Sequence, residues 1–466
     1  MDRPAMNRDN ILNLIINIFS LILIIVPLSG LRYKEMNAAV LVTFAINGLV
    51  CLLGAMYTRQ NISIHRMVYI FSLFFFFIAP LMQYDSQIVF WQNWGLTGGY
   101  SSEDYFHANI IVLVFLLCFE LGYRLPNNKV RSMRELDLGK NFLINGNTRL
   151  VLMIASVVCL VITFFEGGLF SLHTFNQNES MLGQFLLIIR FLPVATLLFY
   201  ILALKQKCVI GKSQTFLTVM ILVNTILYFP FSGATARFVL FGVYLSIWAA
   251  IGSKSKLKSI FFLTVIIGFM YVFSAFNIFK SGSFADFHLV SSSSFLSVDF
   301  DAYQLLMLTQ RYVSVFGSTH VMNLISTALC FIPRSIFSFR LEASGGMVAE
   351  AFGSRFLNVS SPLPAEMLLA GGNIAVVLIS SLFGFLIQII DTWSSCTNIL
   401  KQGIFCILAG FSIFLLRGSL LPAWSYTLSI MITLIGTYFI IIQCGKRDGK
   451  RVESVDRKIQ KYMGEL

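Results

Sequence analysis

Long apolar runs separated by short polar stretches form the main pattern along this chain. A helix needs about 20 apolar residues to cross the roughly 30 Å hydrocarbon core of a bilayer. About twelve runs approach this length, near residues 11–29, 37–57, 68–84, 108–125, 150–168, 185–204, 215–232, 235–252, 260–279, 374–391, 404–420 and 424–443. The pattern predicts an all-α polytopic membrane protein in which residues 1–466 form a single transmembrane domain.

The composition excludes an ordinary soluble domain. Of the 466 residues, 57% are hydrophobic and 12% are charged, whereas soluble domains carry about 25% charged residues. The formal net charge is +12, but membrane proteins collect Lys and Arg on their cytoplasmic loops. We therefore expect the lipid bilayer, and not a nucleic acid, as the partner of this charge. The 8 cysteines form no CxxC motif, so no disulfide framework or metal-thiolate site is expected.

The distribution of basic residues predicts the orientation of the chain. If the N-terminus is cytoplasmic, 24 of the 34 Lys and Arg residues fall in segments on that side. Segments 85–107 and 169–184, on the opposite side, contain neither Lys nor Arg. The positive-inside rule then places both termini in the cytoplasm and the long segment 281–373 in the periplasm.

The segment 281–373 is the one long loop that this topology predicts. Its apolar patch from Val321 to Ile332 is too short to span a bilayer and favours a re-entrant or interfacial helix. A loop of this length is usually functional or disordered. Its aromatic and apolar content argues against disorder, so we expect this loop to be structured and functional.

Arginine dominates the ten basic residues that remain outside the cytoplasmic segments, of which eight are Arg. Arginine stays ionised and grips phosphate through a planar fork, whereas lysine acts as a point charge. Arg190, Arg237 and Arg417 lie inside apolar runs near their outer ends. Such residues either serve a function or reach outward to lipid headgroups. The set as a whole favours an anionic ligand, and a lipid-linked phosphate or diphosphate suits it best.

Three stretches resemble a known family. They are SGATARFVLFG at 232–242, FIPRSIFSF at 331–339 and NVSSPLPAEMLLAGGN at 358–373. Together with the hydropathy layout, they resemble the Wzy-type O-antigen polymerases, also called oligosaccharide repeat unit polymerases. This chain has Ala365 before the acid where members often have Gly, and Phe337–Ser338 where many have Trp-Pro.

The resemblance implies a membrane-embedded glycosyltransferase with a GT-C-like architecture. Such an enzyme moves the growing glycan from undecaprenyl diphosphate onto a new undecaprenyl-diphosphate-linked repeat unit, on the periplasmic side of the bacterial inner membrane. It works after a flippase, and a Wzz-type chain-length regulator is the protein partner that the resemblance implies.

The resemblance and the residue chemistry together give a set of candidate site residues. A diphosphate leaving group needs positive charge, and the attacking sugar hydroxyl benefits from a general base. Glu366 matches the family motif and is the first candidate for the base, followed by Glu350 and His320; each of these could instead be a solvated residue or the partner of a neighbouring Arg. The candidates for binding the diphosphate are Arg237, Arg311, Arg334, Arg340, Arg355 and Arg417.

A metal site is the less favoured alternative for the leaving group. Many glycosyltransferases chelate a cation with paired acids, and Asp299 and Asp301 form such a pair in the sequence DFD. A tripeptide of this kind arises easily by chance, and Arg is abundant. We therefore expect catalysis without a metal ion or other cofactor.

Two other functions fit parts of the pattern. A lipid-linked oligosaccharide flippase would also need outward-facing arginines, but along a cavity formed by helices with short loops. An O-antigen ligase shares the bundle, the large loop and the arginines, and differs in its acceptor. The stretch FIPRSIFSF favours the polymerase over the ligase.

Overall fold

The computed structural model carries all 466 residues, and its regular structure in the parts it describes is helical. An isolated bridge pairs Ile144 with Val209. The described residues are 8–32, 36–56, 62–90, 99–125, 142–165, 181–228, 234–252, 258–268, 295–332 and 336–464.

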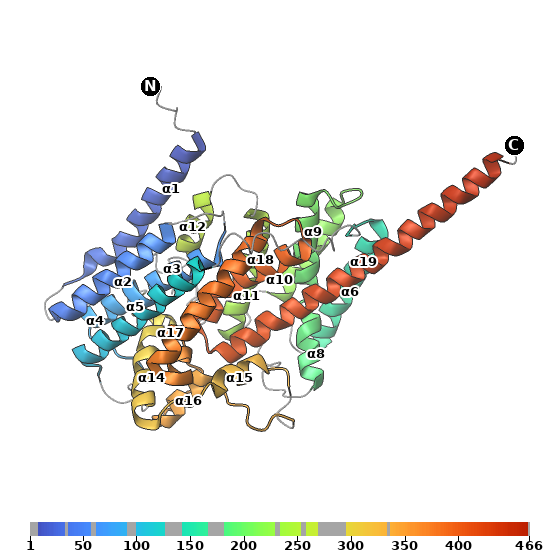
Figure 1. The fold of residues 1–466 in the computed structure, drawn as a ribbon. Helices are drawn as coiled ribbons and strands as arrows, with labels where there is room; N and C mark the ends of the chain where they lie inside the picture. Colours follow the sequence, from blue (N-terminus) through green and yellow to red (C-terminus); the bar gives the residue numbers. More distant parts are fainter. Residues whose placement is uncertain are drawn as a thin grey trace. The chain divides into compact units, whose positions relative to one another are not determined.

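The chain divides into two compact units, which are described separately (Figure 1). The first comprises Met1–Ser132, Gly252–Ser394 and Leu408–Tyr426, and the second comprises Met133–Ile251, Ser395–Ile407 and Thr427–Leu466. The helices of the first unit are α1 (Arg8–Ile25), η1 (Val26–Gly30), α2 (Ala38–Met56), α3 (Ile64–Leu73), η2 (Phe74–Ile78), α4 (Ala79–Asp85), α5 (Ser102–Arg124), α12 (Lys258–Ile267), η8 (Val298–Phe300), α14 (Ala302–Phe316), α15 (Met322–Ala328), α16 (Ser344–Ala351) and α17 (Leu363–Thr392). Those of the second unit are α6 (Gly146–Phe165), α8 (Met181–Arg190), α9 (Leu192–Gln206), α10 (Gln214–Leu227) and α11 (Ala234–Gly252). The short η9 (Trp393–Ser395) and the long helices α18 (Ile399–Arg417) and α19 (Leu420–Gly464) contribute residues to both units.

Nine helices in the described part of the chain are long and apolar enough to cross a membrane. They confirm an all-α, multi-pass membrane protein. They lie at Ile11–Gly30, Ala38–Met56, Ile64–Asp85, Ser102–Arg124, Gly146–Phe165, Ile188–Gln206, Leu363–Ser395, Ile399–Arg417 and Leu420–Gly445.

The remaining three of the twelve expected spans differ from this set. The runs at 215–232 and 235–252 correspond to shorter apolar helices, Gln214–Leu227 and Val239–Gly252. The run at 260–279 begins with α12, and its part beyond residue 268 lies outside the described residues. Apolar length in a sequence thus overstates helix length where the helix ends early, as α10 does at Leu227.

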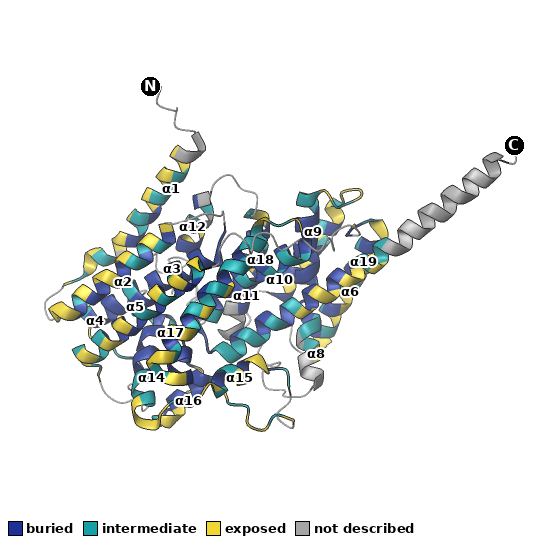
Figure 2. Ribbon diagram, in the orientation of Figure 1, coloured by how far each residue is buried: buried dark blue, intermediate teal, exposed yellow. Residues whose placement is uncertain are grey.

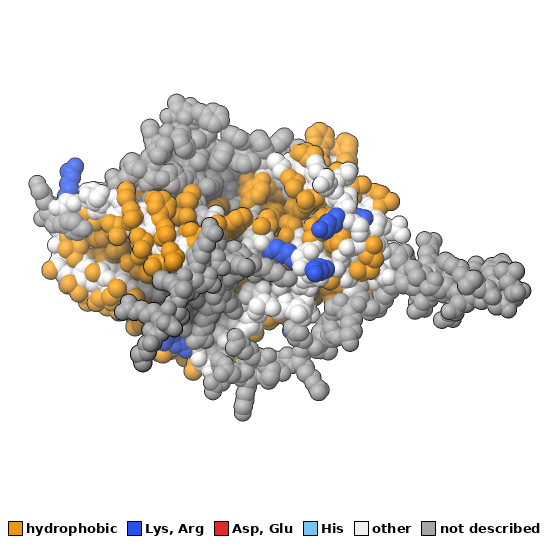
Figure 3. Space-filling model, turned by 90° about the horizontal axis from the view of Figure 1, so that it is seen from above, with side chains coloured by type: hydrophobic (Ala, Val, Ile, Leu, Met, Phe, Trp, Pro, Cys, Tyr) orange, Lys and Arg blue, Asp and Glu red, His pale blue; other side chains and the backbone are white. Residues whose placement is uncertain are grey.

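The surface of the long helices is apolar, as a lipid environment requires. On α1, Ile15 and Ile22 are more than half exposed, and on α2 Leu49 and Leu53 are too. Figure 2 shows exposed positions along both α1 and α2, whereas the residues of α3 are buried. Hydrophobic side chains also cover much of the described surface seen from above in Figure 3.

Helices α5 and α17 run parallel and make the closest helix contact in the first unit. A Cβ atom added to Gly384 would lie 2.0 Å from the carbonyl oxygen of Phe119, and one added to Gly122 would lie 1.9 Å from that of Ser381. Both glycines therefore allow the two backbones to touch, as small residues do between membrane helices.

A buried carboxylate fixes the same end of this helix pair to α3. Asp391, near the end of α17, accepts hydrogen bonds from the Ser63 hydroxyl (2.6 Å) and the Ile64 backbone N–H (2.7 Å). The hydroxyl of Tyr123 on α5 donates to the same carboxylate at 3.1 Å. The carboxylate thus caps the N-terminus of α3 and joins three helices.

The described part of the long loop is folded onto the opposite end of these helices. The first half of α14, from Ala302 to Thr309, is fully buried. Its Tyr303 hydroxyl lies 2.9 Å from Oδ1 of Asn109 on α5, and its Gln304 amide donates to Gln83 on α4 at 3.1 Å. The expectation of a structured loop is confirmed for these residues, and the expected short helix at 321–332 is α15.

We expect Gly384→Ala to lower the stability of the protein. The added methyl group would meet backbone that cannot move aside, and overpacking of this kind costs about 1–3 kcal/mol. Gly436→Ala on α19 is the matched control, because a Cβ there meets nothing within 4 Å and Ala favours the helix over Gly. Thermal unfolding in detergent would measure both variants. Equal unfolding temperatures for the two would refute the close approach of α5 and α17.

Candidate functional site

The turn between α18 and α19 gathers several of the candidate residues in the first unit. Arg417 ends α18, and its Nη2 atom donates to Oδ1 of Asp301 at 3.0 Å. Its Nε atom donates to the carbonyl oxygen of Asp299 at 3.0 Å. Two features that the sequence treated separately, the embedded arginine and the DFD motif, therefore form one ion pair.

Asp301 is buried, as its partner Arg417 is, and it accepts a further hydrogen bond. Its side chain is 2% exposed and that of Arg417 is 12% exposed. The Ser360 hydroxyl donates to Oδ1 of Asp301 at 2.8 Å. Burial raises the pKa of Asp301, and Arg417 and Ser360 oppose that effect. The ion pair is thus a buried contact that joins the start of α14 to the end of α18.

Glu366 lies in the first turn of α17 and is 1% exposed. Its Oε2 atom accepts a hydrogen bond from Nδ2 of Asn323 at 3.0 Å. Its Oε1 atom accepts one from the backbone N–H of Leu420 at 2.8 Å and another from the hydroxyl of Ser344. Both carboxylate oxygens are therefore occupied by protein donors, which offsets the cost of burying a polar group.

Three helices begin around this carboxylate. α16 begins at Ser344, α17 at Leu363 and α19 at Leu420, and each N-terminus carries partial positive charge. Ser419 adds a link, because its Oγ accepts the Gly345 N–H at 3.0 Å. We call the residues Asp301, Asn323, Ser344, Ser360, Glu366, Arg417, Ser419 and Leu420 the loop–bundle junction.

The segment that carries Glu366 ends at a break in α17. Gly371 and Gly372 have non-helical backbone angles, and Gly372 has a φ of 68°, which favours glycine. The break leaves the carbonyl groups of Leu369 and Ala370 without helical partners. The backbone N–H groups of Thr319 and Val321 donate to them, each at 2.8 Å.

The loop that caps this break is itself strained. His320 has a φ of 48° and Val321 a φ of 69°. Positive φ is unusual for a residue other than glycine and most unusual for a β-branched one. Strain of this kind persists only where the surroundings fix it, and it gathers at functional sites. His320 is exposed on this loop.

The candidate bases thus differ in access. Glu366 is enclosed in the junction, whereas His320 and Glu350, the latter at the end of α16, are exposed. A substrate hydroxyl can reach either exposed side chain directly. It can reach Glu366 only after the helix N-termini around that carboxylate separate.

The candidate arginines in the first unit are not gathered at one point. Arg311 forms an ion pair with Asp104 at 2.7 Å, and its guanidinium stacks on Tyr100 at 4.7 Å from the ring centroid. Arg340 donates from Nη1 to the carbonyl oxygens of Cys330 (2.9 Å) and Ile332 (3.0 Å). Arg355 is exposed after α16.

Two of the expected diphosphate ligands have no described side chain. Arg334 lies outside the described residues. Arg237 lies on α11 in the second unit, where only the helix is described. In that unit Arg190 is 1% exposed, so its side chain does not reach outward to lipid headgroups. The binding of a diphosphate by the six candidate arginines stays a prediction.

Four polar residues of the junction escaped the sequence analysis. They are Asn323, Ser344, Ser360 and Ser419, all buried. Short polar residues are common in loops, and no motif distinguishes these. Their one signal is position, because each lies in or beside a mainly apolar stretch, where a buried polar side chain needs a partner.

Neither a metal centre nor a known relative adds to this picture. Within the described residues, no three His, Cys, Asp or Glu side chains lie close enough together to hold a metal ion. Metal-independent catalysis stays a prediction. No family model, curated protein or solved structure matches this chain.

Removing Arg417 should destabilise the protein more than removing the half-buried cation Arg311. Breaking a buried ion pair costs about 3–5 kcal/mol, because the partner stays buried without compensation. A more exposed pair contributes about 1 kcal/mol or less, and the side chains of Arg311 and Asp104 are 32% and 22% exposed. We therefore expect a large loss of unfolding free energy for Arg417→Gln, a small one for Arg311→Gln, and partial recovery in Asp301→Asn/Arg417→Gln.

The loss should also depend on pH. Without Arg417, the folded-state pKa of Asp301 rises further, so the folded variant binds more protons than the unfolded chain. Its stability then falls as pH rises, and the gap from the wild type narrows towards low pH. Unfolding midpoints measured between pH 5 and 8 would show this. A gap that widens towards low pH would contradict the assignment.

Proposed function

We propose that this chain polymerises oligosaccharide repeat units that are linked to a lipid diphosphate in the membrane. The observation that carries the proposal is the loop–bundle junction. It joins the long loop to the apolar helices through the acid and the arginine that the sequence analysis singled out, Glu366 and Arg417. The motif around Glu366 resembles that of the Wzy-type O-antigen polymerases.

The chemistry of such a transfer sets two demands. The bond between the glycan and its diphosphate must break, and the departing diphosphate needs positive charge. The attacking hydroxyl of the new repeat unit must lose a proton to a base. Exposed groups of both kinds lie in the described part of the long loop, namely Arg355 for charge and Glu350 and His320 for the proton.

In this proposal Glu366 is a positioning residue. Its oxygens hold Asn323, Ser344 and Leu420 in place, so it fixes α15 and α16 against the starts of α17 and α19. The base is then His320 or Glu350. His320 is the stronger choice, because its strained loop is hydrogen-bonded to the carbonyl groups of Leu369 and Ala370, at the break in the helix that carries Glu366.

The proposed location follows from the function. A lipid-linked substrate made in the cytoplasm and carried across the bacterial inner membrane would meet the long loop on the periplasmic side, with both termini of the chain in the cytoplasm. The basic residues favour this orientation. The protein partner that the proposal implies is a Wzz-type chain-length regulator.

Reconstitution tests the function directly. Purified protein in liposomes should convert an undecaprenyl-diphosphate-linked repeat unit into a ladder of longer lipid-linked glycans and release undecaprenyl diphosphate. Addition of a chelator tests metal dependence in the same assay. Transfer only to a lipid A core acceptor would identify a ligase, and movement of the lipid across the bilayer without new glycosidic bonds would identify a flippase.

The roles of the candidate residues should separate in this assay. We expect His320→Asn to lower kcat by about a hundredfold or more, the usual contribution of a general base. Glu366→Gln should keep most of the rate and the wild-type pH profile, because the amide oxygen of Gln still accepts the hydrogen bonds of Oε1, and only the bond from Asn323 Nδ2 to Oε2 is lost. Glu366→Ala should lower stability.

Glu350→Gln and Arg32→Ala complete the comparison. Glu350→Gln distinguishes the two exposed candidates, and Arg32 is an exposed residue outside every motif. Loss of turnover in a well-folded Glu366→Gln protein, with an altered pH profile, would make Glu366 the base and refute its positioning role. That result would leave the proposed function standing.

A further inference from the structure

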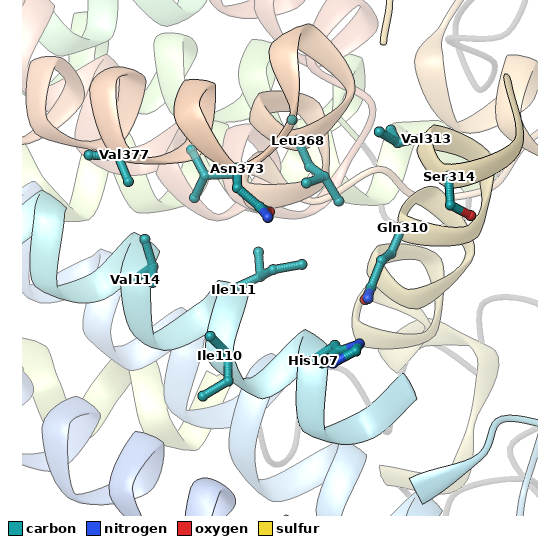
Figure 4. A pocket seen from close by; sticks show the side chains of 12 residues that line it. His107, Ile110, Ile111, Val114, Gln310, Val313, Ser314, Leu368, Asn373 and Val377 are labelled. Atoms are coloured by element: carbon teal, nitrogen blue, oxygen red, sulfur yellow. The ribbon is translucent and has the colours of Figure 1, made fainter. Parts of the chain in front are cut away.

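A cavity separates the outer halves of α5 and α17. Their inner halves touch at Gly122 and Gly384. The break at Gly371–Gly372 separates the first segment of α17 from the rest of that helix. The cavity that results has a volume of about 470 Å³, and α14 closes its outer end (Figure 4). Small-molecule sites in proteins range over roughly 300–1,000 Å³.

The lining changes character along the cavity. His107, Gln310, Ser314 and Asn373 line it where α14 and the break approach α5. Further along α5 and α17 the lining is apolar, and it extends to Val114 and Val377. Figure 4 shows the side chain of Asn373 pointing into the gap between the two helices, with Gln310 beside His107. The cavity is thus polar at one end and apolar along its length.

The apolar part opens sideways onto the surface of the membrane helices. The lining residues Ile110 and Val377 are 37% and 42% exposed. Their neighbours Ile374 and Leu378 on α17 are 75% and 64% exposed. In a helix that spans the bilayer, such side chains face lipid. A ligand can therefore enter from the hydrocarbon without first crossing water.

The polar end contains an unmet hydrogen-bonding group. The Oε1 atom of Gln310 is buried and has no hydrogen-bond partner among the described residues. A buried amide oxygen without a donor is costly, and native structures contain few. A ligand hydroxyl at this level would supply the donor, and a singly protonated phosphate carries one.

The cavity also borders the segment that carries Glu366. Leu368 lines the cavity and follows Glu366 by two residues on the same helical segment. Two residues along a helix correspond to a rotation of about 200°, so the side chains of Glu366 and Leu368 point to nearly opposite sides of the helix. A chain in the cavity would therefore pack on one side of this segment while the loop–bundle junction lies on the other.

We propose that the cavity binds the first isoprene units of a polyprenyl-phosphate lipid, with its polar end beside Gln310 and its chain between α5 and α17. The choice of a polyprenyl chain over the acyl chain of a phospholipid rests on the proposed function. The location itself rests on the lateral opening, the apolar length and the polar end.

Photo-crosslinking in nanodiscs tests the site without requiring turnover. The probes are a polyprenyl phosphate with a diazirine in its first isoprene units and a phosphatidylglycerol with a diazirine in an acyl chain. The polyprenyl probe should label peptides that contain 107–114 and 373–377, and unlabelled polyprenyl phosphate should compete. Mass spectrometry of the labelled peptides gives the readout.

A pair of neighbouring substitutions provides the matched control. Val377→Trp fills the cavity, whereas Leu378→Trp places the same ring on the adjacent lipid-facing position. We expect Val377→Trp to reduce labelling by about tenfold or more, equivalent to about 1.4 kcal/mol of binding free energy. Leu378→Trp should leave labelling unchanged. Equal effects of the two substitutions would overturn the site.

The probes also separate this inference from the proposed function. Equal labelling by the phospholipid probe, with no competition from polyprenyl phosphate, would overturn the polyprenyl assignment. A protein that polymerises repeat units but is not labelled at these peptides would refute the site alone. A protein that is labelled as expected but forms no glycan would refute the function and support the site.

Discussion

A helix that breaks inside a membrane protein must find new donors for the carbonyl groups that the break releases, because lipid supplies none. In α17 the break at Gly371–Gly372 releases the carbonyls of Leu369 and Ala370, and the loop at 319–321 satisfies both. This single requirement fixes where the loop lies. It also explains why His320 and Val321 keep positive φ angles, since the two hydrogen bonds hold the backbone there.

The contact between the 319–321 loop and the break in α17 also positions the residues of the loop–bundle junction. Asn323 follows the capping loop directly, and its amide reaches both the carbonyl oxygen and the carboxylate of Glu366 at 3.0 Å. The carboxylate then draws the starts of α16 and α19 together through Ser344 and Leu420. Because these bonds share one acid, a movement that opens the junction must break several of them at once. The loop is therefore attached to the membrane helices by several hydrogen bonds that share one carboxylate, and not only through the two ends of its chain.

The sequence predicted the membrane helices well and the loop only in part. Apolar runs show where helices lie, and the expected start of a span at 374 falls just beyond the Gly371–Gly372 break. The turn before that break, which carries Glu366, was included in the predicted loop 281–373, but it belongs to α17, which begins at Leu363. The burial of α14 was also missed, since its polar residues Gln304 and Thr309 are paired inside the first unit and not exposed.

The candidate site was also predicted only in part, but for a different reason. Arg417 was recognisable because a charge inside an apolar run is costly and needs an explanation, and Glu366 because it lies in the motif that resembles a known family. Their partners were not, because hydrogen bonds such as Ser360 to Asp301 join residues 59 positions apart, and nothing local predicts them. Uncharged side chains give no comparable signal, whatever their burial.

The pairing of the arginines narrows where a phosphate can bind. Arg417 faces a carboxylate on Asp301 and Arg311 faces one on Asp104, so a second anion would compete with an acid already in place. Arg340 is held differently, because its Nη1 atom donates to the backbone carbonyl oxygens of Cys330 and Ile332. An anion could therefore bind to Arg311 or Arg417 only by displacing the acid that each of them already contacts.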